Sequence, residues 1–137
     1  MIICPDKINQ KRHVEFFKDV ETVKAHMKEH AKLIRPKFEL AYSYLEKLPQ
    51  ECGTFSKPTG GYFITYFTSK PIAKKVVSFC KEMGVLITPA GSMYPNSYDP
   101  DDSAIRLAPT YVSKEELANA MEVFTTAVEL AHFDINI

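Results

Sequence analysis

The chain has 137 residues, of which 45% are hydrophobic and 25% are charged, so it is long enough to form one domain with a buried core. Its 17 lysine and arginine residues balance 17 aspartate and glutamate residues, and the zero net charge argues against nucleic acid or an acidic membrane surface as a partner. No apolar run approaches the roughly 18 residues of a membrane span, and the N-terminus lacks the features of a signal peptide. The three cysteines are scattered without CxxC spacing, so we expect a reducing, cytoplasmic location.

The N-terminal third of the chain contains an aperiodic segment followed by a long helical pattern. Residues 1–18 mix polar and aromatic side chains without a clear period, and we expect an irregular arm or connector there. Over residues 19–48, apolar residues recur every three or four positions, which predicts an amphipathic helix with Asp19 as its N-cap. Pro36 lies inside this pattern and has no backbone donor, so we expect a kink or a split there.

The middle of the chain alternates loops, strands and a second helix. Residues 50–61 are rich in glycine and proline and are expected to form a loop, and residues 62–67 contain the β-branched and aromatic residues typical of a strand. A second helix is predicted to follow, with Pro71 near its first position and Gly84 just after its end. A short apolar run at 85–88 then predicts another strand.

The C-terminal third is predicted to contain a long loop, a third strand and a last helix. In the loop, 90–103, three aspartates resemble part of a calcium loop, but the central glycine and final glutamate of that pattern are missing, so we interpret them as a turn. The strand is 104–108. Ser113 and Glu116 form a capping-box pattern that opens the last helix.

These elements follow the order helix, strand, helix, strand, strand, helix. The sequence therefore predicts an α+β fold, in which helices cover one face of a small mixed or antiparallel sheet of about three strands. We find no internal repeat, low-complexity tract or second domain.

The segment H-M-K-E-H at 26–30 matches the H-x-x-E-H zinc pattern, with His26 and His30 one helical turn apart. Met27 belongs to the apolar stripe, neighbouring lysines indicate a solvated face, and no third ligand is apparent. We therefore expect two surface histidines and no metal.

Arg106 is the strongest local signal, because it interrupts an apolar strand. Alternation places Ile105 and Leu107 on one side of the strand and Arg106, between two small alanines, on the other. A buried arginine needs an anionic partner, and its planar guanidinium suits a carboxylate held by two hydrogen bonds. The partner could be a ligand or an acidic residue of the same chain, or the arginine could lie in water on an edge strand.

Gly60 and Gly61 lack the spacing of a phosphate loop, and a strand follows them instead of a helix. We interpret them as a turn that needs positive φ, or as a place where backbone approaches a ligand closely.

Taken in order, five segments resemble the C-terminal small domain of class I, fold-type-I aminotransferases that depend on pyridoxal phosphate. They read PDKINQKRH (5–13), RPKF (35–38), KPTGGYF (57–63), GVLITPAGS (84–92) and AIRLAP (104–109). The similarity is greatest to the bacterial aspartate-aminotransferase-like, MocR-like branch. The resemblance implies an arm at 1–18 and a small domain at 19–137.

The resemblance also implies a role for five residues. Arg106 would bind the α-carboxylate of an amino-acid or 2-oxo-acid substrate through a two-pronged salt bridge. The turn beside the substrate pocket would contribute Gly60, Gly61, Tyr62 and Phe63. The complete enzyme would be a homodimer that transfers an amino group, with aspartate as the expected donor.

In this family, the lysine that carries pyridoxal 5′-phosphate and the large domain lie before the point where this chain begins. We therefore expect this polypeptide alone to bind no cofactor and to have no transaminase activity. Two other readings stay open: a stand-alone α+β regulatory module that binds an amino acid, and a fragment that only dimerises through surfaces that the large domain would cover. Residues 1–18 distinguish an independent module from an aminotransferase fragment, because an independent module has no need of an aromatic, polar arm.

Overall fold

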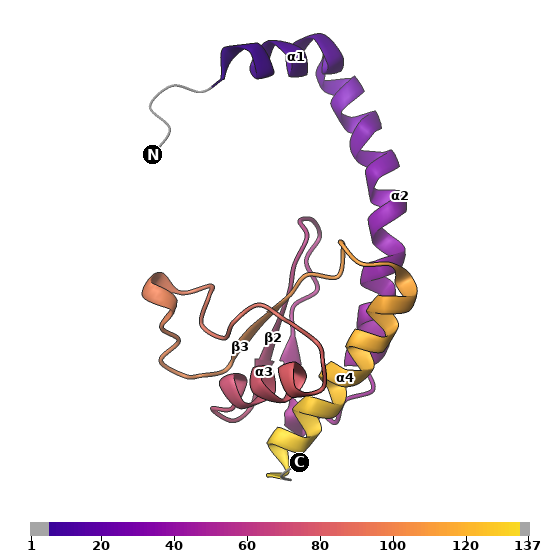
Figure 1. Cartoon of the computed structure of the whole chain (residues 1–137). Coiled ribbons are helices and arrows are strands. Elements are labelled where there is room, and N and C mark those ends of the chain that lie inside the picture. Colours follow the sequence, from indigo (N-terminus) through magenta and orange to yellow (C-terminus); the bar gives the residue numbers. More distant parts are fainter. Residues whose placement is uncertain (1–5, 135–137) are drawn as a thin grey trace. The chain divides into compact units, whose positions relative to one another are not determined.

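The computed structural model describes residues 6–134 and divides the chain into two compact units, Met1–Pro36 and Lys37–Ile137 (Figure 1). The boundary between these units follows the compactness of the chain and does not test the predicted boundary at residue 18. The division into an arm at 1–18 and a small domain at 19–137 therefore stays a prediction.

The first unit begins with helix α1 (Lys7–Phe17), which corrects the expectation of an irregular segment. The Asp6 carboxylate caps it by accepting hydrogen bonds from the amides of Ile8 and Asn9, at 3.0 and 3.2 Å. None of its residues is buried. The helix was missed because periodicity detects a helix through its buried face, and α1 has none.

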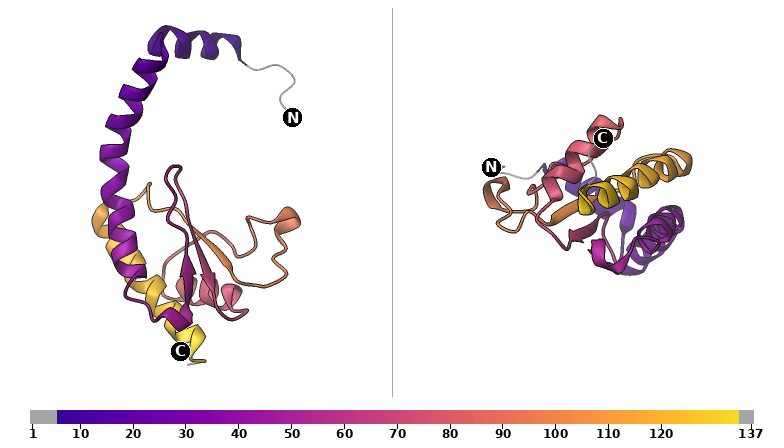
Figure 2. Two further views of the ribbon diagram at one scale, coloured as in Figure 1. Left: turned by 180° about the vertical axis from the view of Figure 1, so that it is seen from behind. Right: turned by 90° about the horizontal axis from the view of Figure 1, so that it is seen from below.

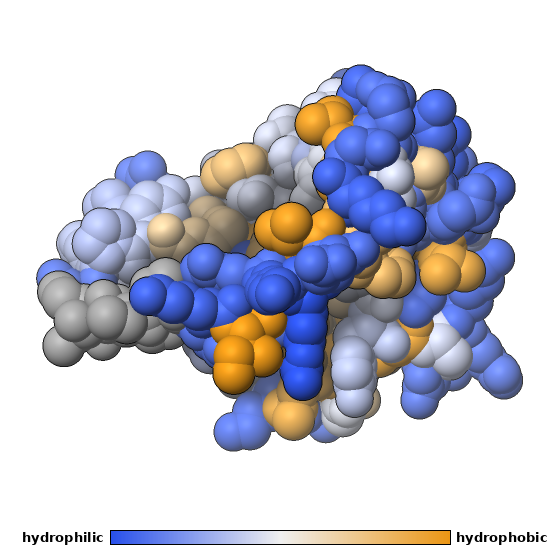
Figure 3. All heavy atoms as spheres, turned by 90° about the horizontal axis from the view of Figure 1, so that it is seen from above, coloured by the Kyte–Doolittle hydropathy of each residue, from blue (hydrophilic) through white to orange (hydrophobic). Residues whose placement is uncertain are grey.

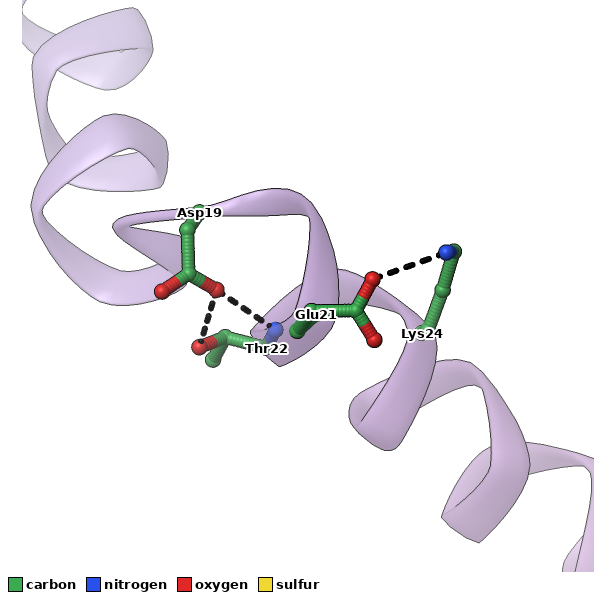
Figure 4. A network of polar contacts seen from close by, with 4 residues as sticks. All are labelled: Asp19, Glu21, Thr22 and Lys24. Atoms are coloured by element: carbon green, nitrogen blue, oxygen red, sulfur yellow. Dashed lines mark hydrogen bonds and ion pairs between the residues drawn. The ribbon is translucent and has the colours of Figure 1, made fainter.

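Helix α2 (Val20–Leu45) confirms the predicted amphipathic helix and its N-cap. One Asp19 carboxylate oxygen accepts hydrogen bonds from the amide and the hydroxyl of Thr22, each at 2.8 Å (Figure 4). These bonds lower the pKa of Asp19. The helix continues through Pro36, so the expected split is wrong. The carbonyl that Pro36 leaves without a helical donor is that of Lys32, an exposed residue, where water can satisfy it.

The second unit contains a three-stranded antiparallel sheet in the order β1-β2-β3, which confirms the α+β class (Figure 1). Its strands are β1 (Gly53–Phe55), β2 (Ile64–Thr68) and β3 (Ala104–Leu107). Helices α3 (Ala73–Glu82) and α4 (Lys114–His132) belong to the same unit and lie side by side (Figure 2). Short 3-10 helices lie at Gln50–Cys52 and Pro95–Ser97.

The core lies on one face of this sheet. Ile64 and Tyr66 of β2 pair with Leu107 and Ile105 of β3, and all four side chains are buried. The helices contribute buried residues to the same cluster: Ala41 and Leu45 from α2, Val76, Phe79 and Cys80 from α3, and Leu117, Met121, Phe124 and Val128 from α4. The helices therefore cover one face, as the sequence predicted, and the alternate residues of β2 and β3 face the other side.

Two strand predictions need correction, and with them the order of elements. Residues 85–88 form no strand, and Leu86 is 82% exposed, so an apolar run alone did not indicate pairing. The sheet instead gains β1, within the segment 50–61 that was predicted to be a loop, and its three residues are too few for a period to be detected. The observed order is α1, α2, β1, β2, α3, β3, α4.

The ends of α3 and α4 show which local signals were sufficient to predict where a helix begins or ends. The capping box of Ser113 and Glu116 is confirmed, and Gly84 follows α3 with a φ of +87°. Pro71 is not at the first position of α3, which begins at Ala73. The residue that binds the first amides of α3 is Asp102, whose carbonyl and carboxylate accept from the amides of Ala73 and Lys74. A loop distant in sequence therefore caps this helix.

Candidate functional site

The site is built on the face of the sheet opposite the core, where Arg106 of β3 is paired with Thr65 of β2. The backbone of Thr65 is hydrogen-bonded toward β1, because its carbonyl accepts from the amide of Ser56 at 2.8 Å and its amide donates to the Ser56 hydroxyl at 2.9 Å. Thr65 and Arg106 are thus a non-hydrogen-bonded pair, in which the Cα atoms approach to about 4.5 Å and the side chains lie close together.

Arg106 is a half-buried cation that has no acidic partner among residues 6–134. Its guanidinium carbon lies 4.7 Å from the centroid of the Phe63 ring, over the ring face. Its Nε atom is buried and has no hydrogen-bond partner. None of the ion pairs within residues 6–134 includes Arg106, so an internal salt bridge, one of the three readings of this residue, is not what the structure shows.

A buried donor without a partner costs about 1–3 kcal/mol, and more when the group is charged. The face of the Phe63 ring stabilises the cation, but it leaves the buried Nε donor of Arg106 without a hydrogen-bond partner. The in-plane donors of Arg106 can therefore receive an anion, and a carboxylate fits them with two parallel bonds.

The Gly60–Gly61 turn is open on the described structure. A Cβ atom at either glycine would meet no atom within 4 Å. Gly61 has a φ of +89°, as the turn interpretation requires, whereas Gly60 has no positive φ. Tyr62 and Phe63 follow it and are about half exposed. Of the four residues predicted beside Arg106, Phe63 contacts it, whereas a binding role for Gly60, Gly61 and Tyr62 stays a prediction.

Met93 brings the long loop between α3 and β3 to this face. The Thr65 hydroxyl donates a weak hydrogen bond to the Met93 sulfur, at 3.8 Å. Sequence analysis missed both residues. The alternation of β2 could have placed Thr65 opposite the buried Ile64 and Tyr66, but no local signal connects Met93 to the sheet.

Asp99 fastens the same loop to the start of β3. Its carboxylate is 4% exposed and accepts hydrogen bonds from the amides of Ala104, Ser103 and Asp101, at 2.9, 2.9 and 3.1 Å. Burial alone would raise the pKa of Asp99, but these three bonds outweigh it and hold the pKa below the usual value. The predicted turn is confirmed, and it leads directly into the strand that carries Arg106.

The described residues contain no group of three or more histidine, cysteine, aspartate or glutamate side chains that could hold a metal. Within the first unit, the His26 ring contacts the rings of Phe16, Phe17 and His30, with centroids 5.9, 5.3 and 6.4 Å away. Two hollows of the surface lie along α1 and are lined by α1 residues alone, so neither includes Arg106.

Four lysines of the second unit form hydrogen bonds within the protein. Lys37 donates to the carbonyls of Thr110 and Val112, and the amines of Lys57, Lys70 and Lys75 bind Glu46, the His132 carbonyl and Asp134. A Schiff base with pyridoxal phosphate requires an amine that is available to react. These four lysines do not fit that role.

None of the helices in residues 6–134 is long and apolar enough to cross a membrane.

Comparison with known proteins identifies the family. The family model described as aspartate amino-transferase matches residues 1–136. An aspartate aminotransferase from Corynebacterium glutamicum is 40% identical over 131 residues, which are 94% of this chain and 30% of that protein. The chain thus spans about a third of the length of the curated relatives it matches.

Solved structures agree with this assignment. An aspartate transaminase from C. glutamicum superposes with a TM-score of 0.89 at 37% identity, over 96% of this chain and 32% of the other. A kynurenine aminotransferase from Pyrococcus horikoshii, 22% identical, shares the fold with a TM-score of 0.69 over 83% of this chain and 27% of its own. The expected resemblance to the C-terminal domain of an aminotransferase is confirmed, and the chain belongs to the aspartate amino-transferase family.

Proposed function

We propose that this chain is the substrate-binding small domain of a pyridoxal-phosphate-dependent amino-acid aminotransferase, in which Arg106 holds the α-carboxylate of the substrate. The observation that carries the proposal is the state of Arg106: a half-buried guanidinium over the ring of Phe63, with its Nε lacking a partner and no acidic side chain of residues 6–134 paired to it. The name of the 40% identical relative supports aspartate as donor, and the family resemblance implies a 2-oxo acid as acceptor.

In this proposal the domain acts by positioning. Two parallel N–H···O bonds fix both the distance and the plane of a carboxylate, and the Phe63 ring, 4.7 Å from the guanidinium carbon, stabilises the cation that forms them. A substrate held in this way has its Cα atom fixed in one position, so less entropy is lost when the transition state forms. The Gly60–Gly61 turn and Tyr62 would form one wall of the pocket.

Lys37, Lys57, Lys70 and Lys75 do not fit the cofactor, and the resemblance places the lysine of the Schiff base outside this chain, so we propose that pyridoxal phosphate is bound by the rest of the enzyme. On this basis the chain alone has no transaminase activity. A homodimeric, cytoplasmic enzyme is the arrangement that the family resemblance and the free cysteines Cys52 and Cys80 favour.

The proposal can be tested by measuring kcat/KM of a hybrid enzyme, in which this chain replaces the matching segment of the C. glutamicum aspartate aminotransferase. Arg106→Lys replaces the planar fork by a point charge and removes one charge-assisted hydrogen bond, so kcat/KM for aspartate should fall about 10- to 100-fold. Arg35→Lys makes the same substitution at an exposed arginine outside the site and should change kcat/KM less than twofold. Equal kcat/KM for the Arg106→Lys hybrid and the parent hybrid would refute the assignment.

A binding measurement on the chain itself separates this proposal from a regulatory amino-acid sensor. In a titration with L-aspartate followed by the NMR signal of Arg106 Nε–H, a domain that forms only part of the pocket should bind in the millimolar range. Micromolar affinity would instead indicate a complete site and a stand-alone binding module.

A further inference from the structure

We propose that Thr65 is a second carboxylate-binding residue, whose hydroxyl donates to the anion that Arg106 holds. This inference rests on the proposed function of Arg106 and extends it to a neighbour on the opposite strand. It is carried by three features: the pairing of the two residues, the weak acceptor that the Thr65 hydroxyl now has, and the absence of a polar side chain at the other outward pair of the β2–β3 ladder.

The pairing brings Thr65 within reach of the same ligand. Directly opposite residues in an antiparallel sheet have Cβ atoms about 4.5–5.5 Å apart, and the shorter end applies to non-hydrogen-bonded pairs such as Thr65 and Arg106. A carboxylate spans two oxygens, so one can lie against the guanidinium while the other faces the strand beside it. Both side chains are half-buried, which limits competition from water.

The hydroxyl of Thr65 can change its acceptor at little cost. It now donates to the Met93 sulfur at 3.8 Å, and a thioether is a weak acceptor. A carboxylate oxygen forms a charge-assisted bond that is about twice as strong as a neutral one. The proton can rotate about the C–O bond while the oxygen stays in place, because the Thr65 backbone is fixed on the β1 side by Ser56.

The other outward pair of the β2–β3 ladder carries no polar side chain. Phe67 pairs with Ala104, two positions along from Thr65 and Arg106. Between Ile64 and Thr68 on one strand and Ala104 and Leu107 on the other, the outward side-chain donors are therefore the Thr65 hydroxyl and the Arg106 guanidinium. They lie directly opposite each other, which is the arrangement that one small anion can bridge.

The experiment uses the hybrid enzyme and an isosteric substitution. Thr65→Val removes the hydroxyl but keeps the β-branched shape, and it should raise KM for L-aspartate about tenfold while kcat changes less than twofold. Thr65→Ser restores the hydroxyl and should return KM to within threefold of the parent. Thr54→Val is the matched control, because Thr54 is an exposed threonine of β1 opposite Phe67, one strand farther from Arg106.

The outcomes separate the two proposals. If Arg106→Lys weakens the enzyme and Thr65→Val leaves KM unchanged, the role of Thr65 is refuted and that of Arg106 stands. If neither substitution has an effect, the proposed function itself fails. A rise in KM that Thr65→Ser does not reverse would also refute the inference, since it would show a packing effect and not a hydroxyl contact.

A binding measurement provides a second readout that does not depend on turnover. In the L-aspartate titration of the chain, Thr65→Val should weaken binding about tenfold relative to the parent, and Thr54→Val should leave it unchanged. Equal affinity for the Thr65→Val chain and the parent chain would overturn the inference whatever the hybrid shows.

Discussion

Replacing Asp99 by alanine would release the loop that leads into the strand of Arg106. The Asp99 carboxylate accepts hydrogen bonds from three backbone amides. The Ala104 amide is buried, and the Asp101 and Ser103 amides are partly buried. A buried donor left without its partner costs about 1–3 kcal/mol, and a partly buried donor costs less because water can replace the acceptor. We therefore expect Asp99→Ala to lower the free energy of unfolding by about 3–4 kcal/mol.

Asparagine at the same position should cost less, for a geometric reason. One carboxylate oxygen accepts from both Ser103 and Ala104, and the other accepts from Asp101. The amide oxygen of Asn can keep the first two bonds, while its NH₂ group would face the Asp101 amide, donor against donor. Asp99→Asn should therefore lower the free energy of unfolding by about 1–2 kcal/mol.

The measurement is urea unfolding of the full chain at pH 7, followed by near-ultraviolet circular dichroism, to which the buried Tyr66 contributes. Asp101→Ala is the control, because the Asp101 side chain is exposed, and it should change stability by less than about 0.5 kcal/mol. A loss below about 1 kcal/mol for Asp99→Ala would show that the three amides find other acceptors, and the reasoning would be wrong.

The same residue predicts the direction of a pH dependence. Three hydrogen bonds to the carboxylate hold the folded-state pKa of Asp99 below the usual 3.8. A group whose pKa is lower in the folded state stabilises the fold fully above its unfolded pKa and loses that contribution as the pH falls through the folded value. The advantage of the parent chain over Asp99→Asn should thus be constant near neutral pH and shrink below about pH 4. An advantage that grew on acidification would contradict the assignment.

Two further substitutions test the frame that holds the site. Ser113→Ala removes the hydroxyl that accepts a hydrogen bond from the Glu116 amide, one of the two bonds of the capping box. Urea unfolding should show that the free energy of unfolding falls by about 1 kcal/mol, and no change would mean that α4 does not depend on its cap. Gly53→Ala would place a Cβ atom 2.2 Å from the Phe67 carbonyl oxygen of the neighbouring strand, so it should cost more than about 3 kcal/mol or abolish folding. Gly60→Ala, whose Cβ would meet no atom within 4 Å, is the matched control and should be tolerated; equal stability of the two variants would contradict the pairing of β1 with β2.

The errors in the predicted elements have a common cause. Helix α1 has no buried residue, and strand β1 has three residues, so neither leaves a hydrophobic period in the sequence. The run at 85–88 has an apolar composition but no strand partner, because β3 pairs with β2 directly. Periodicity finds elements that bury a face over several turns or residues, and it fails for elements held by local caps or by a single neighbour.

Four features were determined by the sequence itself. It specified the amphipathic part of α2, the capping box of α4 and the glycine after α3, because each depends on residues within a few positions of one another. It also singled out Arg106, because one charge in an alternating apolar strand is visible locally. These signals were enough to indicate the fold class and the residue on which the proposed function rests.

What surrounds Arg106 was decided only by the tertiary structure. The Phe63 ring lies against the guanidinium, Thr65 lies opposite Arg106, and Met93 contacts Thr65 from a separate loop. These contacts depend on the register of β2 against β3 and on the Asp99 turn, which join segments far apart in the chain. A local pattern shows which face of a strand a residue occupies, but the neighbour across the sheet is fixed only when the strands pair, since a shift of one residue would turn every side chain to the other face.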